Sequence, residues 1–307
     1  MKPLRISIVE YLNTAPLVRG FTHGPLRGKY GLSFTVPSQC AEALRSQSAD
    51  IAIIPAIEYQ RIPALVILPN LSISSKKAVR SLLLVSKKPI REVTSIALDR
   101  SSRSTQALTH MLCRKWWGIA PDFFEAEPDL PAMLLGADAA LLIGDPALRV
   151  SLGCGPTAKR GPTGIVTCPG TSAGCPHEPS VFLYDIVEEW RGLTGLPAVL
   201  ALWAARRDVA TPEVVRDFQD SFLFGRSHLE KISREAAREM NLPAAELQRY
   251  LAENIDYSLD EENQQGLRLY FDLAAELGLL SNYQEIRIAN VPPIQEPHSE
   301  LAGAPRR

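Results

Sequence analysis

The sequence predicts an α/β protein with largely parallel sheets. Short apolar runs with the length of buried strands, such as 51–55 and 139–143, alternate with helical segments along most of the chain. Hydrophobic residues make up 46% and charged residues 22% of the 307 residues, which is enough apolar material for a large core. The composition excludes a disordered chain, and the length suggests about two domains.

The first ninety residues predict the order β-α-β-α-β. An alternating strand over 4–9 is followed by a helix that Asn13 or Thr14 caps, with Pro16 tolerated in its first turn. A second helix is expected from Pro37 to Leu44. Further strands are expected at 32–36, 50–55, 66–68 and 81–85.

The middle of the chain repeats this alternation up to residue 153. A strand at 95–98 turns into a helix that ends at Leu112, and a strand at 139–143 closes on Gly144-Asp145-Pro146 and a short helix. Residues 154–180 are dense in Gly, Pro, Ser and Thr and predict a long surface insertion. A helix at 184–190, a strand at 197–203, an all-helical part at 212–279 and a terminal tail follow.

The net charge, the N-terminal residues and the cysteines indicate which partners and which cellular compartment to expect. Lys and Arg number 33 against 34 Asp and Glu, so the net charge of -1 gives no reason to expect nucleic-acid or membrane binding. The first residues lack a signal peptide, and no stretch approaches eighteen uninterrupted apolar residues. Five cysteines without CxxC spacing imply no disulfide framework. We expect a cytoplasmic protein.

The usual motifs for phosphate loops, dinucleotide binding and nucleophile elbows are absent from the sequence. Cys154, Cys168, Cys175 and His177 form the most suggestive metal pattern, within the insertion. Zinc sites usually use close ligand pairs, and only Cys175 and His177 are close, so incidental thiols are the simpler interpretation. We expect no metal.

Short polar residues follow several predicted strands, where ligands bind in open α/β sheets. They are Asn13 and Thr14, Ser81, and the run Ser102, Arg103, Ser104 and Thr105. Helix starts of this kind also favour anions, because their backbone N–H groups and dipole present positive charge. Each residue alone fits an ordinary helix cap, but together they could converge on one cleft. Asp145 fits either a helix cap or a ligand-facing or hinge residue.

Several segments together carry a specific pattern. They are YLNTAPL at 11–17, ADIAIIP at 49–55 with EY at 58–59, SSKKAVRS at 74–81, LDRSSR at 98–103, LIGDPAL at 142–148, and TGLP at 194–197 before ALW at 201–203. In this order and spacing they resemble the chorismate dehydratase family of the futalosine route to menaquinone, over about residues 4–280. Ala198, Ser104-Thr105 and the long insertion depart from the family pattern.

The resemblance implies a two-lobed periplasmic-binding-protein type II fold with a central ligand cleft. Lobe one would comprise residues 1–90 and 195–307, with a helical C-terminal part. Lobe two would comprise residues 91–194, including the Gly/Pro/Cys-rich insertion at 154–180. The strands at 81–85 and 197–203 would lie near the two chain crossings.

The resemblance also implies a carbon–oxygen lyase that converts chorismate to 3-[(1-carboxyvinyl)oxy]benzoate and water without a cofactor. Asn13 and Ser81 are assigned to the catalytic centre, where Asn13 orients the reacting carboxylate or hydroxyl and Ser81 hydrogen-bonds the substrate. Substrate binding is assigned to Thr14, Ser102, Arg103, Ser104, Thr105 and Asp145. The sequence offers no motif-level His or Glu base, in agreement with proton transfer to the substrate's own enolpyruvyl carboxylate. A monomer or homodimer is expected.

Three other functions remain open at this stage. A dihydroxynaphthoate-forming enzyme of the same pathway shares the fold, but its SPCPNDT loop is absent here. A solute-binding protein would need export or a lipid anchor, and the N-terminus carries neither signal. A ligand-sensing domain would need a DNA-binding helix pair, and none is evident. Whether Glu58, Tyr59 or Trp203 contacts the substrate is also left open.

Overall fold

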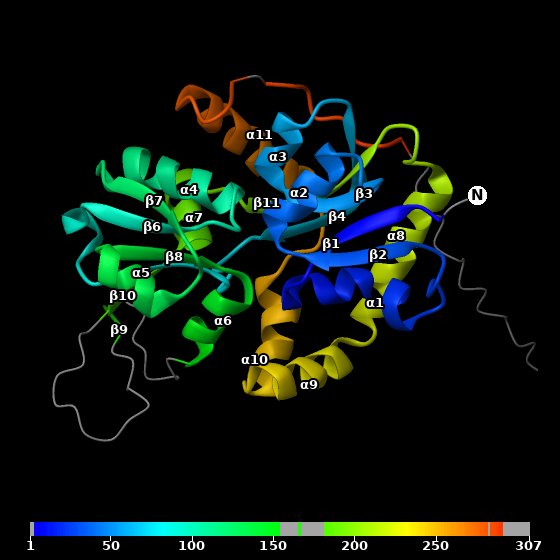
Figure 1. Cartoon of the computed structure of the whole chain (residues 1–307), viewed down its shortest axis with the longest axis horizontal. Helices are drawn as coiled ribbons and strands as arrows, with labels where there is room; N and C mark the ends of the chain where they lie inside the picture. The colour runs from blue at the N-terminus through cyan, green and yellow to red at the C-terminus, as the bar shows by residue number, and fades with distance from the viewer. Residues whose placement is uncertain (1–2, 154–164, 167–180, 282, 291–307) are drawn as a thin grey trace, which may run out of the picture.

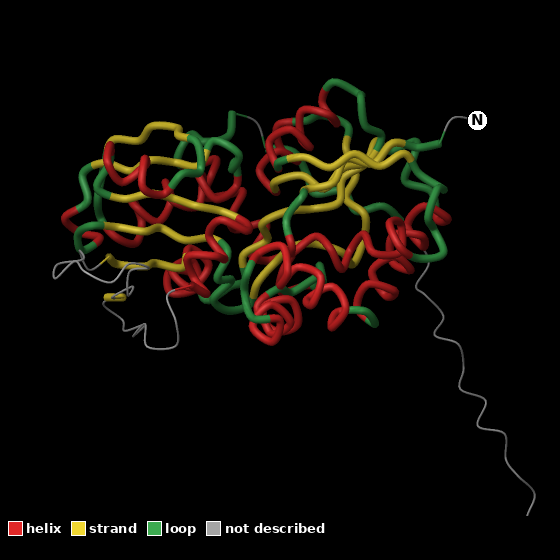
Figure 2. The backbone as a smooth tube through the Cα atoms, turned by 60° about the horizontal axis from the view of Figure 1, so that its bottom comes forward, coloured by secondary structure: helices red, strands yellow, loops and turns green. Residues whose placement is uncertain are grey.

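Two separate β-sheets, each with its own helices, organise the chain into two lobes (Figures 1 and 2). The computed structural model describes residues 3–153, 165–166, 181–281 and 283–290. The first sheet is built from strands at residues 5–75 and from one strand at 198–206, whereas the second sheet is built from the part of the chain between them. The chain therefore crosses between the lobes twice.

The first sheet has the strand order β2-β1-β3-β11-β4. Its strands are β1 (Arg5–Val9), β2 (Gly31–Thr35), β3 (Ile51–Pro55), β4 (Leu65–Ser75) and β11 (Ala198–Arg206). β1 is parallel to β2 and β3, and β11 is antiparallel to β3 and β4. All five residues of β3 are buried, as a central strand covered on both faces requires.

Helices cover both faces of the first sheet (Figure 1). On one side lie α2 (Pro37–Arg45), α3 (Ala56–Arg61) and α11 (Glu261–Glu276). On the other lie α1 (Ala15–His23), α8 (Pro212–Arg226), α9 (Leu229–Met240) and α10 (Ala244–Arg249), followed by the π-helical turn η4 (Tyr250–Asn254). A Cβ at Gly225 would lie 1.9 Å from the Pro16 carbonyl oxygen, so α1 and α8 approach closely only because this residue is glycine.

The second sheet has the strand order β7-β6-β8-β5-β10-β9. Its strands are β5 (Leu82–Ser86), β6 (Ser95–Asp99), β7 (Asp122–Ala126), β8 (Ala139–Ile143), β9 (Ile165–Val166) and β10 (Val181–Asp185). Its helical segments are η2 (Ile90–Glu92), α4 (Ser104–Leu112), η3 (Cys113–Trp117), α5 (Leu130–Gly136), α6 (Gly144–Gly153) and α7 (Ile186–Thr194). β6 is parallel to β7 and β8, whereas β5 is antiparallel to β8 and β10.

The expected α/β alternation is confirmed, and the differences have physical reasons. β7 was not predicted, because this edge strand keeps half-exposed side chains and shows no apolar run. The helix predicted at 184–190 is wrong at its start, since Val181–Asp185 is a strand and Asp185 caps the helix that follows. β5 pairs in the second sheet, which therefore begins before the suggested lobe boundary at residue 90. Apart from β9, the predicted insertion at 154–180 lies outside the described residues.

A single buried carboxylate ties the two crossings together. Oδ1 of Asp185 accepts hydrogen bonds from the backbone N–H groups of Val187 and Glu188 and so caps α7, the helix through which the chain returns to the first lobe in the second crossing. Oδ2 accepts the backbone N–H of Arg80 at 2.6 Å, in the first crossing at 76–81. Burial raises the pKa of Asp185 to about 6, although these hydrogen bonds act in the opposite direction.

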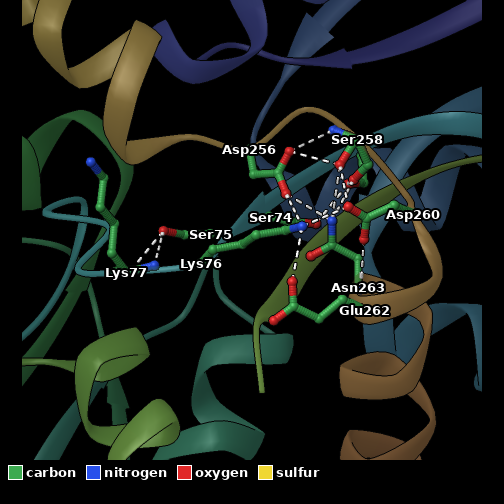
Figure 3. Close-up of polar contacts among 10 residues, drawn as sticks. Ser74, Ser75, Lys76, Lys77, Asp256, Ser258, Asp260, Glu262 and Asn263 are labelled. Carbon is green, nitrogen blue, oxygen red and sulfur yellow. Dashed lines mark hydrogen bonds and ion pairs between the residues drawn. The ribbon is translucent and has the colours of Figure 1, made fainter. Parts of the chain in front are cut away.

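The first crossing is also anchored where it leaves lobe one. Figure 3 shows Lys76 directed at Asp256, Asp260 and Glu262, whereas Lys77 points away from them. The Lys76 ammonium lies 3.0 Å from Glu262 and 3.8 Å from Asp256. Ser74, at the end of β4, exchanges two backbone hydrogen bonds of 2.8 and 2.9 Å with Asp256. The start of this crossing is therefore fixed to lobe one.

We predict that Asp185→Asn changes the pH dependence of folding. Because the folded pKa of about 6 lies above the ordinary value of 3.8, the folded state binds this proton more tightly. The stability that proton uptake contributes is fully present below pH 3.8 and is lost as the pH rises through about 6. From pH 4 to pH 7 the wild type should therefore lose about 2–3 kcal/mol of unfolding free energy that the variant does not lose. Urea titration of both proteins at each pH measures this difference.

Asp138→Asn is the matched control, because the hydrogen bond from Lys88 holds the pKa of Asp138 well below its usual value. The wild type should gain stability over this variant as the pH rises from 2 to 4, the opposite sign. A difference between wild type and Asp185→Asn that does not vary with pH would contradict the assigned burial effect.

Candidate active site

A narrow cleft lies between the two lobes, with a volume of about 60 Å³. Its apolar wall comes from both sheets and includes Val9, Ile53, Ile73, Leu82, Ile143 and Leu200. Its polar lining comes from η1 (Leu12–Thr14) with the preceding Tyr11 in lobe one, and from the start of α4 in lobe two. The volume holds only a few water molecules, so the structure shows the lobes close together.

The structure brings most of the predicted site residues to this cleft. Lining it are Asn13, Thr14, Ser102, Arg103, Ser104 and Thr105. Ser81 and Asp145 do not line it, although their neighbours Leu82 and Gly144 do. Residues far apart in the sequence therefore meet at the ends of strands from two different sheets, as the position of polar residues after strands predicted.

The start of α4 is a helix terminus without a side-chain cap. Arg103 occupies the N-cap position and makes no capping hydrogen bond, so the interpretation of this Ser/Thr run as ordinary caps is wrong. Asp99, which is fully buried, holds the preceding turn by accepting the N–H and the hydroxyl of Ser101 at 2.9 and 2.7 Å. Uncapped N–H groups and a helix dipole at a cleft favour a bound anion.

Charge at this end of the cleft comes from Arg103. Its guanidinium lies 3.3 Å from Glu125, with 39% of the arginine side chain exposed. An exposed pair of this kind is weak in water, so a bound anion can compete with Glu125 for the guanidinium. The helix start and Arg103 together form the part of the cleft best suited to a carboxylate.

Asn13 and Thr14 form the corresponding corner of lobe one. The Thr14 hydroxyl donates to Oδ1 of Asn13 at 3.3 Å, and both residues are buried. The predicted capping role is again wrong, because Thr14 occupies the N-cap position of α1 but its side chain makes no capping hydrogen bond to the helix. The amide carbonyl of Asn13 is held by Thr14, which leaves its NH₂ group as the donor.

Ser81 lies beside the cleft and is completely buried. Its hydroxyl oxygen accepts a hydrogen bond from the Tyr250 hydroxyl at 2.9 Å. Burial raises the pKa of Tyr250 above its ordinary value, and hydrogen bonding to Ser81 and to Asn13 lowers it. Ser81 therefore bonds to a phenol group that the sequence did not single out, and Asn13 lies close enough to this phenol to affect its pKa.

Several hydrogen bonds join the lobes around the cleft. Oδ1 of Asp145 accepts the backbone N–H of Leu12 at 3.0 Å. The Ser104 hydroxyl accepts the N–H of Ile57 at 3.2 Å, and its carbonyl accepts the Tyr270 hydroxyl at 3.1 Å. The sequence left Asp145 open between a helix cap and a ligand-facing or hinge residue. Its carboxylate bonds from lobe two to Leu12 of lobe one, which agrees with the hinge role, and burial raises its pKa.

Tyr11 also bridges the lobes, although the sequence indicated it only as part of the segment at 11–17. Its hydroxyl lies 3.3 Å from the Ser101 hydroxyl, and burial raises the pKa of the phenol to about 12. A Cβ at Gly144 would lie 2.5 Å from the Tyr11 ring, and Gly144 has a φ of +63°. Glycine is therefore required at 144 for the lobes to meet as they do.

The three residues whose contact with the substrate the sequence left open lie outside the cleft. Glu58 is buried and pairs with Arg61 at 2.9 Å and with Arg45. The Tyr59 hydroxyl donates to the Glu285 carbonyl and accepts the Arg287 N–H. Trp203 is fully buried against Phe218. None of the three lines the cleft.

Within the described ranges, no group of three or more His, Cys, Asp or Glu side chains is placed to hold a metal ion. The suggestive pattern of Cys154, Cys168, Cys175 and His177 lies outside those ranges. Among the helices that the structure describes, none has both the length and the apolar character needed to cross a bilayer.

Comparison with known proteins agrees with this geometry. The family profile described as "Menaquinone biosynthesis" matches residues 4–276. A chorismate dehydratase of Thermus thermophilus is 27% identical over 282 residues, which cover 91% of this chain and 97% of the relative. The similarity thus extends through both lobes and both crossings.

Solved structures support the fold. A structural-genomics protein from Archaeoglobus fulgidus superposes with a TM-score of 0.66 at 17% identity, covering 90% of this chain and 98% of that chain. The periplasmic aliphatic sulphonate binding protein of Escherichia coli superposes with a TM-score of 0.60 at 18% identity, covering 98% of each chain. The expected two-lobed periplasmic-binding-protein fold is confirmed.

We predict that Asp145→Ala loosens the contact between the lobes. The Leu12 N–H loses its carboxylate acceptor, and a hydrogen bond to a charged group contributes about 1.5–3 kcal/mol. Amide hydrogen exchange at Leu12 should accelerate by about tenfold or more. Asp129→Ala, which removes a similar bond to Ala132 inside lobe two, should leave Leu12 unchanged. Equal exchange of Leu12 in wild type and Asp145→Ala would refute the link.

Proposed function

The chain belongs to the menaquinone biosynthesis family, and on this premise we propose that it is a chorismate dehydratase. The reaction converts chorismate to 3-[(1-carboxyvinyl)oxy]benzoate and water, which makes the protein a carbon–oxygen hydro-lyase. The observation that carries the proposal is the cleft where Asn13 and Thr14 of lobe one face the uncapped start of α4 in lobe two. The Thermus thermophilus relative bears the same name.

The chemistry needs little covalent help from the protein. The C3–H bond of the ring breaks, its electron pair forms the C3–C4 double bond, and the C4–O bond breaks. The hydroxyl leaves with a proton as water, and the ring becomes aromatic, which provides the driving force. The remaining demand is to hold a dianion in the reactive geometry and to stabilise the charge that shifts during elimination.

The cleft lining supports proton transfer to the substrate's own enolpyruvyl carboxylate. Among the described residues that line the cleft there is no His, Asp, Glu or Lys, and Arg103 and Tyr11 are its titratable groups. Arg103 is a permanent cation, and the raised pKa of Tyr11 keeps its phenol protonated. Neither group is suited to remove a proton from carbon at neutral pH, so the lining favours orientation over general-base catalysis.

The polar groups of the two lobes would then bind different parts of the substrate. The start of α4, with Ser102, Ser104, Thr105 and Arg103, is suited to a carboxylate, because it combines N–H donors, hydroxyls and a guanidinium. The Asn13 amide lies on the opposite lobe and would orient the reacting carboxylate or the leaving hydroxyl, and Ser81 would donate to the substrate. Asp145, whose carboxylate faces Leu12, would act by closing the lobes rather than by touching the ligand.

Incubation of the purified protein with chorismate, without added metal or cofactor and with a chelator present, tests the proposal. We expect an aromatic enol ether, lighter than chorismate by one water molecule, detected by mass and ultraviolet absorbance. Heat-treated protein controls for spontaneous rearrangement of chorismate. Tight binding without turnover would instead indicate a solute-binding protein, and no interaction would exclude chorismate as the substrate.

We predict that Asn13→Ala and Ser81→Ala each lower kcat for chorismate by about 100-fold while the protein stays folded. Loss of one well-placed donor in a catalytic site has an effect of this size. Ser86→Ala is the control for Ser81→Ala. Ser86 is also fully buried, it ends the strand that Ser81 precedes, and among the described residues its hydroxyl bonds to the backbone of Lys88 and Asp138. The kcat of this control variant should match the wild type. Wild-type rates in both cleft variants would remove Asn13 and Ser81 from the mechanism.

A further inference from the structure

Tyr250 does not line the cleft, yet its hydroxyl bonds to Ser81, one of the two residues assigned to catalysis. The phenol donates to Oγ of Ser81 at 2.9 Å, and Asn13 lies near enough to interact with the same oxygen. Ser81 begins the second lobe, whereas Asn13 and Tyr250 belong to the first. The tyrosine is fully buried, so no water competes for these bonds.

The direction of the Tyr250–Ser81 bond decides what Ser81 can do. A serine hydroxyl has one hydrogen to donate and accepts through its oxygen. Because Tyr250 donates, the oxygen of Ser81 is occupied and its own hydrogen remains available. Among the described residues, the bond from Tyr250 is the one side-chain hydrogen bond of Ser81, so no protein acceptor takes that hydrogen. Ser81 is therefore held as a hydrogen-bond donor without a protein partner, next to the cleft residue Leu82.

Hydrogen bonds hold the segment that contains Tyr250 against the first crossing. Asn254 donates through its side-chain amide to the Ala78 carbonyl at 2.8 Å, and Asp256 pairs with Ser74 through the backbone. Figure 3 shows the Ser74 and Asp256 end of this run, beside Lys76. Residues 250–256 thus run antiparallel to residues 74–81 and contact them at three points. The Tyr250 hydroxyl is fixed relative to the segment that carries Ser81.

The helix geometry at Tyr250 is a second, independent observation. α10 ends at Arg249, and residues 250–254 form a π-helical turn, with the Ile255 N–H bonded to the Tyr250 carbonyl at 3.2 Å. Single π-helical turns are less favourable than continued α-helix and occur frequently at functional sites. Here the turn places a phenol inward, at a point where the sequence showed only a helical segment.

We propose that Tyr250 is a positioning residue of the dehydration: it fixes the Ser81 hydroxyl so that Ser81 directs its hydrogen to the substrate. This inference rests on the proposed function and adds a residue that does not touch the substrate. It acts through orientation, so it contributes to the rate of the chemical step rather than to substrate affinity.

Steady-state kinetics of Tyr250→Phe with chorismate test the inference, with the folded fraction measured by circular dichroism. We expect kcat to fall about tenfold and KM to change by less than about threefold. In the Ser81→Ala background the same substitution should cause little further loss, because the residue it orients is already gone. Tyr257→Phe is the matched control, since the Tyr257 hydroxyl is buried without a hydrogen-bond partner among the described residues. Its kcat should equal that of the wild type.

The possible results separate the inference from the proposed function. Wild-type protein that does not turn over chorismate overturns both. Active wild type together with a Tyr250→Phe variant of unchanged kcat, or with losses that multiply in the double variant, overturns the positioning role alone. If Tyr250→Phe does not fold, the double variant with Ser81→Ala removes both bonding partners and leaves neither unpaired. Its kcat should then equal that of Ser81→Ala, and a further fall would refute the inference.

Discussion

One buried carboxylate, Asp185, joins the two chain crossings that connect the lobes. Asp185 binds the Arg80 N–H of the first crossing and caps the helix of the second crossing, so it sets where both segments leave the second sheet. Ser81 is the next residue after Arg80, and its position beside the cleft follows from this bond. A carboxylate without solvent is costly, and the backbone donors around Asp185 offset that cost. The catalytic geometry is thereby linked to the chain topology.

Helix starts, not charged side chains, supply most of the polarity of the cleft. The lining residues from the described chain include one permanent cation, Arg103, which is already engaged by Glu125. Backbone N–H groups do not titrate near neutral pH and need no reorganisation, so they are suited to stabilising charge that develops on a bound ligand. An acidic or basic side chain in this narrow space would be desolvated together with the ligand.

Sequence patterns located the strands and the polar residues that follow them, because buried strands leave long apolar runs and the ends of such strands face one edge of a sheet. The gathering of Asn13, Thr14 and residues 102–105 in one cleft followed from that rule. This rule could not identify Tyr250, because Tyr250 lies in the helical C-terminal part and follows no strand. No local sequence pattern there distinguishes a tyrosine of the core from one beside a site. Sequence patterns also missed β7, whose exposed edge lacks the apolar run, and assigned capping to hydroxyls that make no cap.

The stacking of the Tyr11 ring on Gly144 acts as a spacer between the halves of the molecule. A smaller side chain at 11 would let the halves collapse inward, and any side chain at 144 would wedge them apart. This contact therefore limits how closely the two lobes approach and, with it, the room available to a ligand. The side chain that spaces the lobes and the uncapped helix start that favours an anion thus lie at separate positions of the same cleft.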